Sequence, residues 1–193
     1  MSESRPAAKG RLVVISGPSG AGKTTICSKL LGIDPAYQLS ISATTRPPRG
    51  DEEDGRDYYF LSREQFEKKI QAGELAEYAE YAGNLYGTPK VPLEQATAAG
   101  KMVLMDIDTQ GAAQVAEAYP DAMTIFLEPP DFGQLAQRLN GRATDTPEAK
   151  EERLGIAGRE IARREDYQHI VVNDDLEETV RRIHSIIAGK ENR

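Results

Sequence analysis

Gly17-Pro18-Ser19-Gly20-Ala21-Gly22-Lys23-Thr24 is the most informative segment of this sequence. It matches the pattern G-x-x-x-x-G-K-[ST], which is typical of loops that bind nucleotide phosphates. An apolar run at residues 12–16 comes directly before it, and a helical pattern over residues 23–31 follows and ends at Gly32. This order predicts a buried strand, a phosphate-binding loop and a helix, with backbone N–H groups converging on phosphate oxygens.

The residue types in this loop suit a nucleoside triphosphate with its metal ion. The Lys23 ammonium can reach the β- and γ-phosphates, and the Thr24 hydroxyl can bind Mg²⁺. Another apolar strand, at residues 102–107, leads to Asp106 and Asp108, and either carboxylate can join the metal site through water. We therefore expect ATP and Mg²⁺ at this loop. The pattern differs from G-x-G-x-x-G, which excludes a Rossmann dinucleotide site.

Short apolar strands alternate with helical patterns along most of the chain. Beyond the loop, the sequence predicts strands at residues 102–107, 122–127 and 169–172, and helices at residues 110–118, 131–139 and 176–187. Such alternation favours an α/β fold, with a P-loop NTPase-type parallel sheet flanked by helices.

Two segments depart from this alternation. Residues 44–88 carry a proline-rich Arg46-to-Gly50 segment, a strand-like run at 57–61, a helical pattern at 63–72 and a hairpin at 78–86 that turns at Gly83-Asn84. They predict an inserted α+β lobe, although an irregular packed edge fits the same residues. The polar residues 140–153 lead into a helix from Pro147 to about residue 165, which predicts a moving lid or a static solvated hairpin.

Composition excludes several classes of protein. The 193 residues carry a net charge of −7, which argues against non-specific nucleic-acid binding. No apolar run approaches the roughly 20 residues that span a bilayer, so we expect no membrane contact. The single cysteine, Cys27, rules out an internal disulfide and fits a cytoplasmic protein. We expect one domain behind a loose tail at residues 1–9; a homo-oligomer stays open.

Several further motifs resemble the guanylate kinase family. They are Ser42-Ala43-Thr44-Thr45-Arg46-Pro47-Pro48-Arg49-Gly50, Asp54-Gly55-Arg56-Asp57-Tyr58, Gly83-Asn84-Leu85-Tyr86-Gly87-Thr88, Asp106-Ile107-Asp108-Thr109-Gln110-Gly111 and Val172-Asn173-Asp174-Asp175. They occur in the family's order over about residues 10–188. The resemblance implies a core at residues 10–40 and 97–188, a GMP-binding insert at about 41–96 and a lid at about 140–165.

The resemblance also implies the reaction, which is transfer of the γ-phosphoryl group of ATP to GMP with Mg²⁺. It implies that the GMP phosphate is held by Arg46, Arg49, Tyr58 and Tyr86, and that guanine is read by Ser42, Glu77, Thr88 and Asp106. The residues expected to hold ATP are Gly17, Pro18, Ser19, Gly20, Ala21, Gly22, Lys23, Thr24, Thr25 and Asn173. Those expected at the transferring phosphoryl group are Lys23, Arg46, Arg138, Arg142 and Arg153.

The chemistry of guanine supports this assignment. Guanine presents N1–H and a 2-amino group side by side, and the Glu77 carboxylate can accept from both, while the Ser42 hydroxyl can donate to O6. Adenine lacks this donor pair and would leave the carboxylate unpaired, which discriminates strongly against it. Two alternatives stay open: a kinase of a phosphorylated sugar on the same fold, and a non-catalytic guanylate-kinase-like scaffold module.

Overall fold

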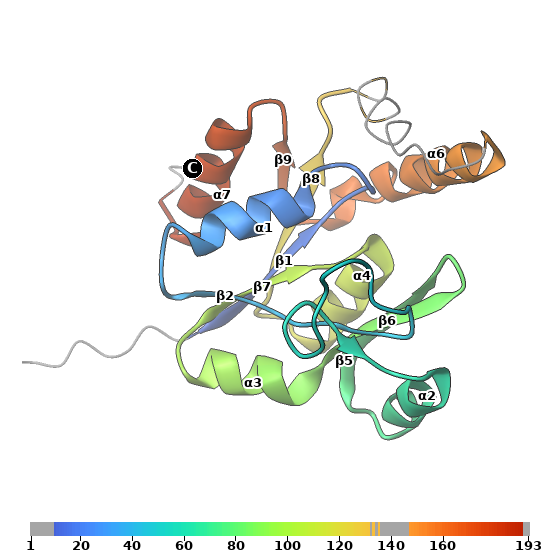
Figure 1. Cartoon of the computed structure of the whole chain (residues 1–193). Helices are drawn as coiled ribbons and strands as arrows, with labels where there is room; N and C mark the ends of the chain where they lie inside the picture. Colours follow the sequence, from blue (N-terminus) through green and yellow to red (C-terminus); the bar gives the residue numbers. More distant parts are fainter. Residues whose placement is uncertain (1–9, 132, 134, 136–146, 191–193) are drawn as a thin grey trace, which may run out of the picture.

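A five-stranded parallel sheet forms the centre of the molecule (Figure 1). The computed structural model describes residues 10–131, 133, 135 and 147–190. The strand order is β2-β7-β1-β8-β9, and all the pairings are parallel. The strands are β1 (Arg11–Ser16), β2 (Tyr37–Leu39), β7 (Met102–Asp106), β8 (Met123–Glu128) and β9 (His169–Val172). The predicted parallel α/β fold is thus confirmed.

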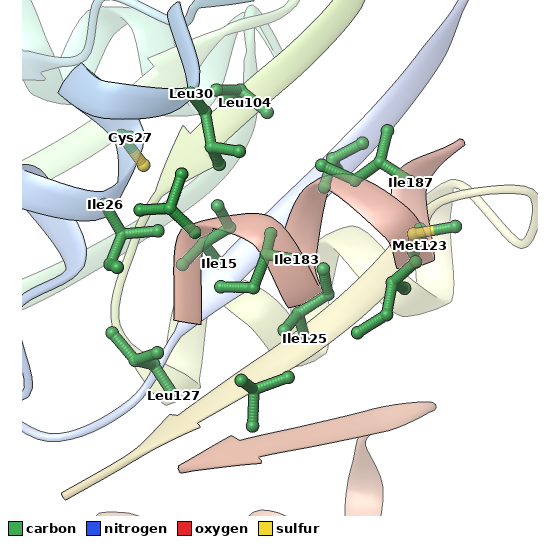
Figure 2. Packing of buried hydrophobic residues seen from close by; sticks show 14 of the residues in the cluster. Ile15, Ile26, Cys27, Leu30, Leu104, Met123, Ile125, Leu127, Ile183 and Ile187 are labelled. Atoms are coloured by element: carbon green, nitrogen blue, oxygen red, sulfur yellow. The ribbon is translucent and has the colours of Figure 1, made fainter. Parts of the chain in front are cut away.

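Alternate residues of β1 point to opposite faces of this sheet, and each face is covered by helices. Val13 and Ile15 belong to a cluster with buried residues of α1 (Lys23–Leu31) and α7 (Leu176–Ile187), which Figure 2 shows from close by. Cys27 lies inside this cluster at 1% exposure, as a small core residue. Burial on both faces explains why the strands are nearly continuous apolar runs.

The opposite face is covered by α3 (Lys90–Ala98) and α4 (Thr109–Ala118). Leu12 and Val14 of β1 pack there with Leu93 of α3 and Val115 of α4. The sequence did not predict α3, and this helix packs on the five-stranded sheet although its residues fall mostly within the expected insert.

A second, four-stranded sheet lies beside the first, with the order β4-β3-β6-β5. Its strands are β3 (Ala43–Thr44), β4 (Tyr59–Phe60), β5 (Leu75–Tyr81) and β6 (Asn84–Pro89). Helix α2 (Arg63–Gln71) begins with a capping box between Ser62 and Gln65 and buries Phe66. Phe66 packs on residues of this sheet, so the second sheet has a small core of its own.

The hairpin between β5 and β6 turns one residue earlier than the sequence predicted. Ala82 and Gly83 form the turn, with φ angles of +49° and +76°. A two-residue hairpin turn of this hand needs positive φ at both positions, and the glycine takes the second of them. Asn84 is therefore the first residue of β6, and the predicted turn at Gly83-Asn84 was wrong.

Helix α6 (Pro147–Ile161) continues into a short 3₁₀ helix, Arg164–Asp166, before β9. The predicted helix at residues 131–139 lies almost wholly outside the described residues, as do Arg138 and Arg142. Arg153 belongs to α6, but its side chain is outside what the structure describes. Within the described residues, no helix is both long and apolar enough to cross a membrane.

Candidate active site

The phosphate-binding loop follows the carboxyl end of β1 and is built on three glycines with positive φ. Gly17, Gly20 and Gly22 have φ angles of +141°, +85° and +98°. A Cβ atom at Gly17 would lie 2.3 Å from the Leu127 carbonyl oxygen, so the loop also needs glycine there for space. This backbone curls where a side chain would strain it, as an anion-binding loop requires.

Lys23 and the start of α1 place positive charge at this loop. Within the described part of the chain, no side chain caps the beginning of α1 at Gly22, and the first N–H groups of a helix are suited to bind phosphate. The Lys23 ammonium donates to the Gly17 carbonyl oxygen at 2.7 Å and to that of Pro18 at 3.3 Å. It therefore lies folded along the loop, within reach of a bound phosphate.

Thr24 and Asp106 lie side by side at the carboxyl ends of the strands. The Thr24 hydroxyl donates to Asp106 Oδ2 at 2.7 Å. A hydroxyl and a carboxylate at this separation are hard oxygen ligands of the kind that Mg²⁺ prefers, and Mg²⁺ takes its other ligands from water and nucleotide phosphates. The residues present thus fit a magnesium site completed by the nucleotide. Among the described residues, no cluster of three or more His, Cys, Asp or Glu side chains could hold a metal ion.

Asp108 has a structural task at the beginning of α4. Its carboxylate accepts hydrogen bonds from the N–H groups of Gln110 and Gly111 at 2.9 and 2.8 Å, and so caps the helix. Of the two aspartates considered for the metal, Asp106 is the one in contact with Thr24.

Asn173 supports the loop from β9. Its side-chain amide donates to the Ala21 carbonyl oxygen at 2.7 Å, and the residue is 7% exposed. The same amide nitrogen would lie 2.6 Å from a Cβ atom at Gly22. The polar side chain therefore packs against the loop backbone and fixes its curvature.

Two adjoining cavities lie around the loop, with volumes of about 670 and 210 Å³. The larger is lined by loop and α1 residues including Gly22, Thr24 and Thr25, and the smaller reaches the second sheet at Glu77 and Tyr86. Both are lined by Ser19, Lys23, Ser42, Tyr58 and Asp106. The phosphate loop and the second sheet thus open onto one continuous space.

Glu77 is a buried carboxylate inside the smaller cavity. It is 4% exposed, and Oε1 accepts a hydrogen bond of 2.6 Å from the Thr88 hydroxyl. Ser42 Oγ lies 3.4 Å from Thr88 Oγ1, which brings three predicted base-reading residues together. Burial raises the pKa of Glu77 to about 7, against a smaller lowering by the Thr88 hydrogen bond. The Glu77 carboxylate is therefore a hydrogen-bond acceptor in the cavity, and further donors would stabilise its charged form.

Arg46 is held by a carboxylate that the sequence analysis missed. Its Nη1 and Nη2 donate to the two oxygens of Glu52 at 2.9 Å each, and Arg46 is only 7% exposed. The hydrogen-bonded Glu52 raises the pKa of the Arg46 guanidinium above its usual value. Glu52 also accepts from the Arg49 N–H at 2.8 Å, so it ties the proline-rich segment together. The position of Glu52, three residues after Arg49, was the sequence feature that could have indicated this contact.

Two tyrosine side chains, Tyr58 and Tyr86, lie close to Arg46. The Arg46 guanidinium lies 5.3 Å from the centre of the Tyr58 ring, and the Tyr58 and Tyr86 rings meet edge to face at 6.3 Å. The structure therefore brings Arg46, Tyr58 and Tyr86 together, as predicted for one anion site. Arg49 is exposed and lines neither cavity.

Glu160 of α6 is another residue that sequence reasoning missed. It lines the smaller cavity, and among the described residues its buried Oε2 has no hydrogen-bond partner. Burial raises the pKa of its carboxyl, while the Lys23 charge lowers it. Helix α6 thus reaches the phosphate loop with a carboxylate.

A third cavity, of about 720 Å³, lies at the other end of the sheet. Gly10 and Arg11 line it at the beginning of β1, whereas the phosphate loop follows the end of that strand. Ligands of parallel α/β sheets bind beyond the carboxyl ends of the strands. We therefore place the nucleotide site at the two cavities around the loop.

Comparison with known proteins agrees with this geometry. A sequence model of the family described as guanylate kinase matches residues 9–190. The chain belongs to the guanylate kinase family. The guanylate kinase of Symbiobacterium thermophilum is 46% identical over 185 residues, which cover 96% of this chain and 88% of that protein. That of a Synechocystis strain is 44% identical over 191 residues, covering 99% of this chain and 100% of the relative.

A solved guanylate kinase structure agrees with this family membership. The crystal structure of guanylate kinase from Anaplasma phagocytophilum superposes with a TM-score of 0.77 at 34% identity, covering 97% of this chain and 88% of that one. A shikimate kinase from Bacteroides thetaiotaomicron gives a TM-score of 0.52 at 16% identity, covering 92% of this chain and 98% of that one. This second likeness concerns the fold alone.

Proposed function

We propose that this chain transfers the γ-phosphoryl group of ATP to GMP, giving ADP and GDP. The observation that carries the proposal is that buried Glu77, which accepts a hydrogen bond from Thr88, lines the same cavity as Lys23 of the phosphate loop. A guanine-reading group and a phosphate-binding group thus line one space. Family membership points to the same reaction.

The second sheet supplies base recognition in this account. Charged Glu77 accepts from guanine N1–H and the 2-amino group, Ser42 donates to O6, and Thr88 holds the carboxylate in place. Adenine would leave the buried carboxylate without donors, and such lost pairings discriminate strongly. Burial raises the pKa of Glu77, so the two guanine donors would stabilise a charge that burial disfavours.

The arginines hold the acceptor phosphate. Arg46 is oriented by Glu52 and faces Tyr58, so its guanidinium is preorganised for an anion. We assign Arg49, Tyr58 and Tyr86 to the same phosphate, and expect Arg49 to turn inward from its exposed position. GMP is a dianion at neutral pH because its second pKa is near ~6, so the phosphate attacks without a general base.

The donor side aligns ATP and neutralises its charge. The loop N–H groups, Lys23 and the start of α1 bind the phosphates, and we expect Arg138, Arg142 and Arg153 to reach the transferring group. Thr24 and Asp106 would hold Mg²⁺, which would offset the negative charge of the phosphates. Alignment and charge neutralisation are the main sources of rate in such a reaction.

Two other functions fit this fold less well. A kinase of a phosphorylated sugar would not need the buried Glu77–Thr88–Ser42 group beside the loop. A scaffold module that only binds proteins would not need the phosphate loop, yet Lys23 and Thr24 are in place here. Both alternatives predict that GMP is not phosphorylated.

The test is a panel of acceptors. The purified protein is incubated with Mg²⁺ and ATP, and separately with GMP, AMP, CMP, UMP or a sugar phosphate, while ADP release is followed. We expect fast turnover with GMP alone. Turnover with a sugar phosphate, or with none of the acceptors, would refute the proposal.

A further inference from the structure

Helix α4 lies against the guanine-reading carboxylate at Gly111. This glycine is buried in the first turn of α4. A Cβ atom built on it would lie 2.4 Å from Glu77 Oε2, 3.0 Å from Cδ and 3.4 Å from Cγ. The three nearest atoms all belong to the Glu77 side chain, so the carboxylate rests directly on the backbone of the helix.

Backbone conformation does not explain a glycine at this position. Gly111 is not among the glycines with positive φ, and alanine favours a helix more than glycine does. An alanine would, however, meet the far end of a flexible side chain and push it aside. The absent side chain therefore serves Glu77 and not the helix.

Gln114 makes a second contact between α4 and the same strand. Its Oε1 accepts from the Tyr78 N–H at 3.1 Å, and its Nε2 donates to the Tyr78 carbonyl oxygen at 2.7 Å. Tyr78 is the neighbour of Glu77 on β5, and positions 111 and 114 share one face of the helix. Two contacts one turn apart thus fix β5 on α4 around the carboxylate.

The same helix is joined to the phosphate loop. It begins at its cap, Asp108, two residues after Asp106, whose carboxylate accepts from Thr24. The distance along the chain from Asp106 to Gly111 is therefore short, and its last part, from Thr109, belongs to α4. α4 can therefore fix the position of the Glu77 carboxylate relative to the phosphate-binding loop.

We propose that Gly111 and Gln114 are positioning residues for guanine recognition, which set the place of the Glu77 carboxylate without touching the substrate. This inference rests on the proposed function, because it assigns Glu77 to the base. It goes further in locating specificity partly in α4, a helix of the core sheet. A carboxylate pushed aside by a methyl group loses the alignment that two parallel hydrogen bonds require.

The test compares Gly111→Ala with Gly32→Ala, a control at the end of α1 where a Cβ atom meets nothing closer than 3.4 Å. We expect Gly111→Ala to raise KM for GMP about tenfold or more, with KM for ATP and the melting temperature close to wild type. The control should leave both KM values unchanged. Gln114→Ala should also raise KM for GMP selectively.

Glu77→Asp shows whether the contact between residue 111 and the Glu77 side chain causes the rise in KM for GMP. Aspartate is one methylene shorter and leaves room for the added methyl group, so Glu77→Asp should cost less in the Gly111→Ala background than in wild type. Additive effects, or a Gly111→Ala protein with normal KM for GMP, would overturn the positioning role. If Gly111→Ala does not fold, an unchanged KM for GMP in Gln114→Ala overturns it. A wild-type protein inactive on GMP refutes the proposed function instead.

Discussion

Thr88 Oγ1 donates a hydrogen bond of 2.6 Å to Glu77 Oε1, and Glu77 lines the smaller cavity beside the phosphate loop. This one neutral donor does not offset burial, and the pKa of Glu77 is raised to about 7. The Glu77 carboxyl therefore takes up a proton at a higher pH than an exposed glutamate does. Guanine supplies the two donors that the charged form lacks.

A pH dependence follows from this raised pKa. Only the charged form of Glu77 accepts both guanine donors, so kcat/KM for GMP should be constant above about pH 8 and fall towards tenfold per unit below about pH 7. Steady-state kinetics between pH 6 and 8.5 would measure it. Glu77→Gln is the control, since it keeps the titration of the GMP phosphate; an equal slope in both proteins would contradict the assignment.

Lys23→Met should separate catalysis from acceptor binding. The ammonium neutralises the transferring phosphate, so its loss should lower kcat by a factor on the order of 10³. The GMP contacts assigned to the second sheet stay intact, and calorimetry should give an affinity for GMP within about twofold of wild type. If GMP binding disappears as well, the division between donor loop and acceptor lobe is wrong.

Thr24→Ala tests the magnesium site. The hydroxyl that contacts Asp106 at 2.7 Å is lost, and the free Mg²⁺ concentration for half-maximal rate should rise about tenfold at fixed ATP. Asp106→Asn should shift the same concentration in the same direction. Unchanged magnesium curves in both variants would show that the ion is held elsewhere.

Glu52→Ala tests how Arg46 is held. The variant removes both hydrogen bonds from a guanidinium that is 7% exposed, and KM for GMP should rise about tenfold because the arginine loses its orientation. Glu53→Ala, at a neighbouring carboxylate paired with Arg56, is the matched control and should leave KM unchanged. A lower KM in Glu52→Ala would mean instead that Glu52 competes with the substrate phosphate.

Sequence patterns predicted the core sheet well because its elements are locally encoded. The strand, loop and helix at residues 11–31 have the right periodicity and glycines, and burial of β1 on both faces gives an unbroken apolar run. The three-residue strand β2 and helix α3 were missed. β2 is too short to show the alternation of apolar and polar residues that marks a strand. α3 begins after Pro89 without a polar side-chain cap.

The site was predicted in its residue types but not in its contacts. Ser42, Glu77 and Thr88 do meet, since strand pairing brings residues 77 and 88 opposite each other. The roles of Gly111, Gln114 and Glu160 were missed because their contacts with Glu77, Tyr78 and the phosphate-loop cavity form only in the folded chain. No local sequence pattern predicts the contact between the Glu77 carboxylate and Gly111, which lies 34 positions further along the chain.

Discrimination between GMP and AMP depends on Glu77 if this carboxylate reads the base. The ratio of kcat/KM for GMP to that for AMP should be measured in wild type and in Glu77→Gln, which replaces the acceptor pair with one acceptor and one donor. We predict a ratio of at least ~10³ in wild type and a fall of about 100-fold or more in the variant. An unchanged ratio would contradict the claim that Glu77 reads the base.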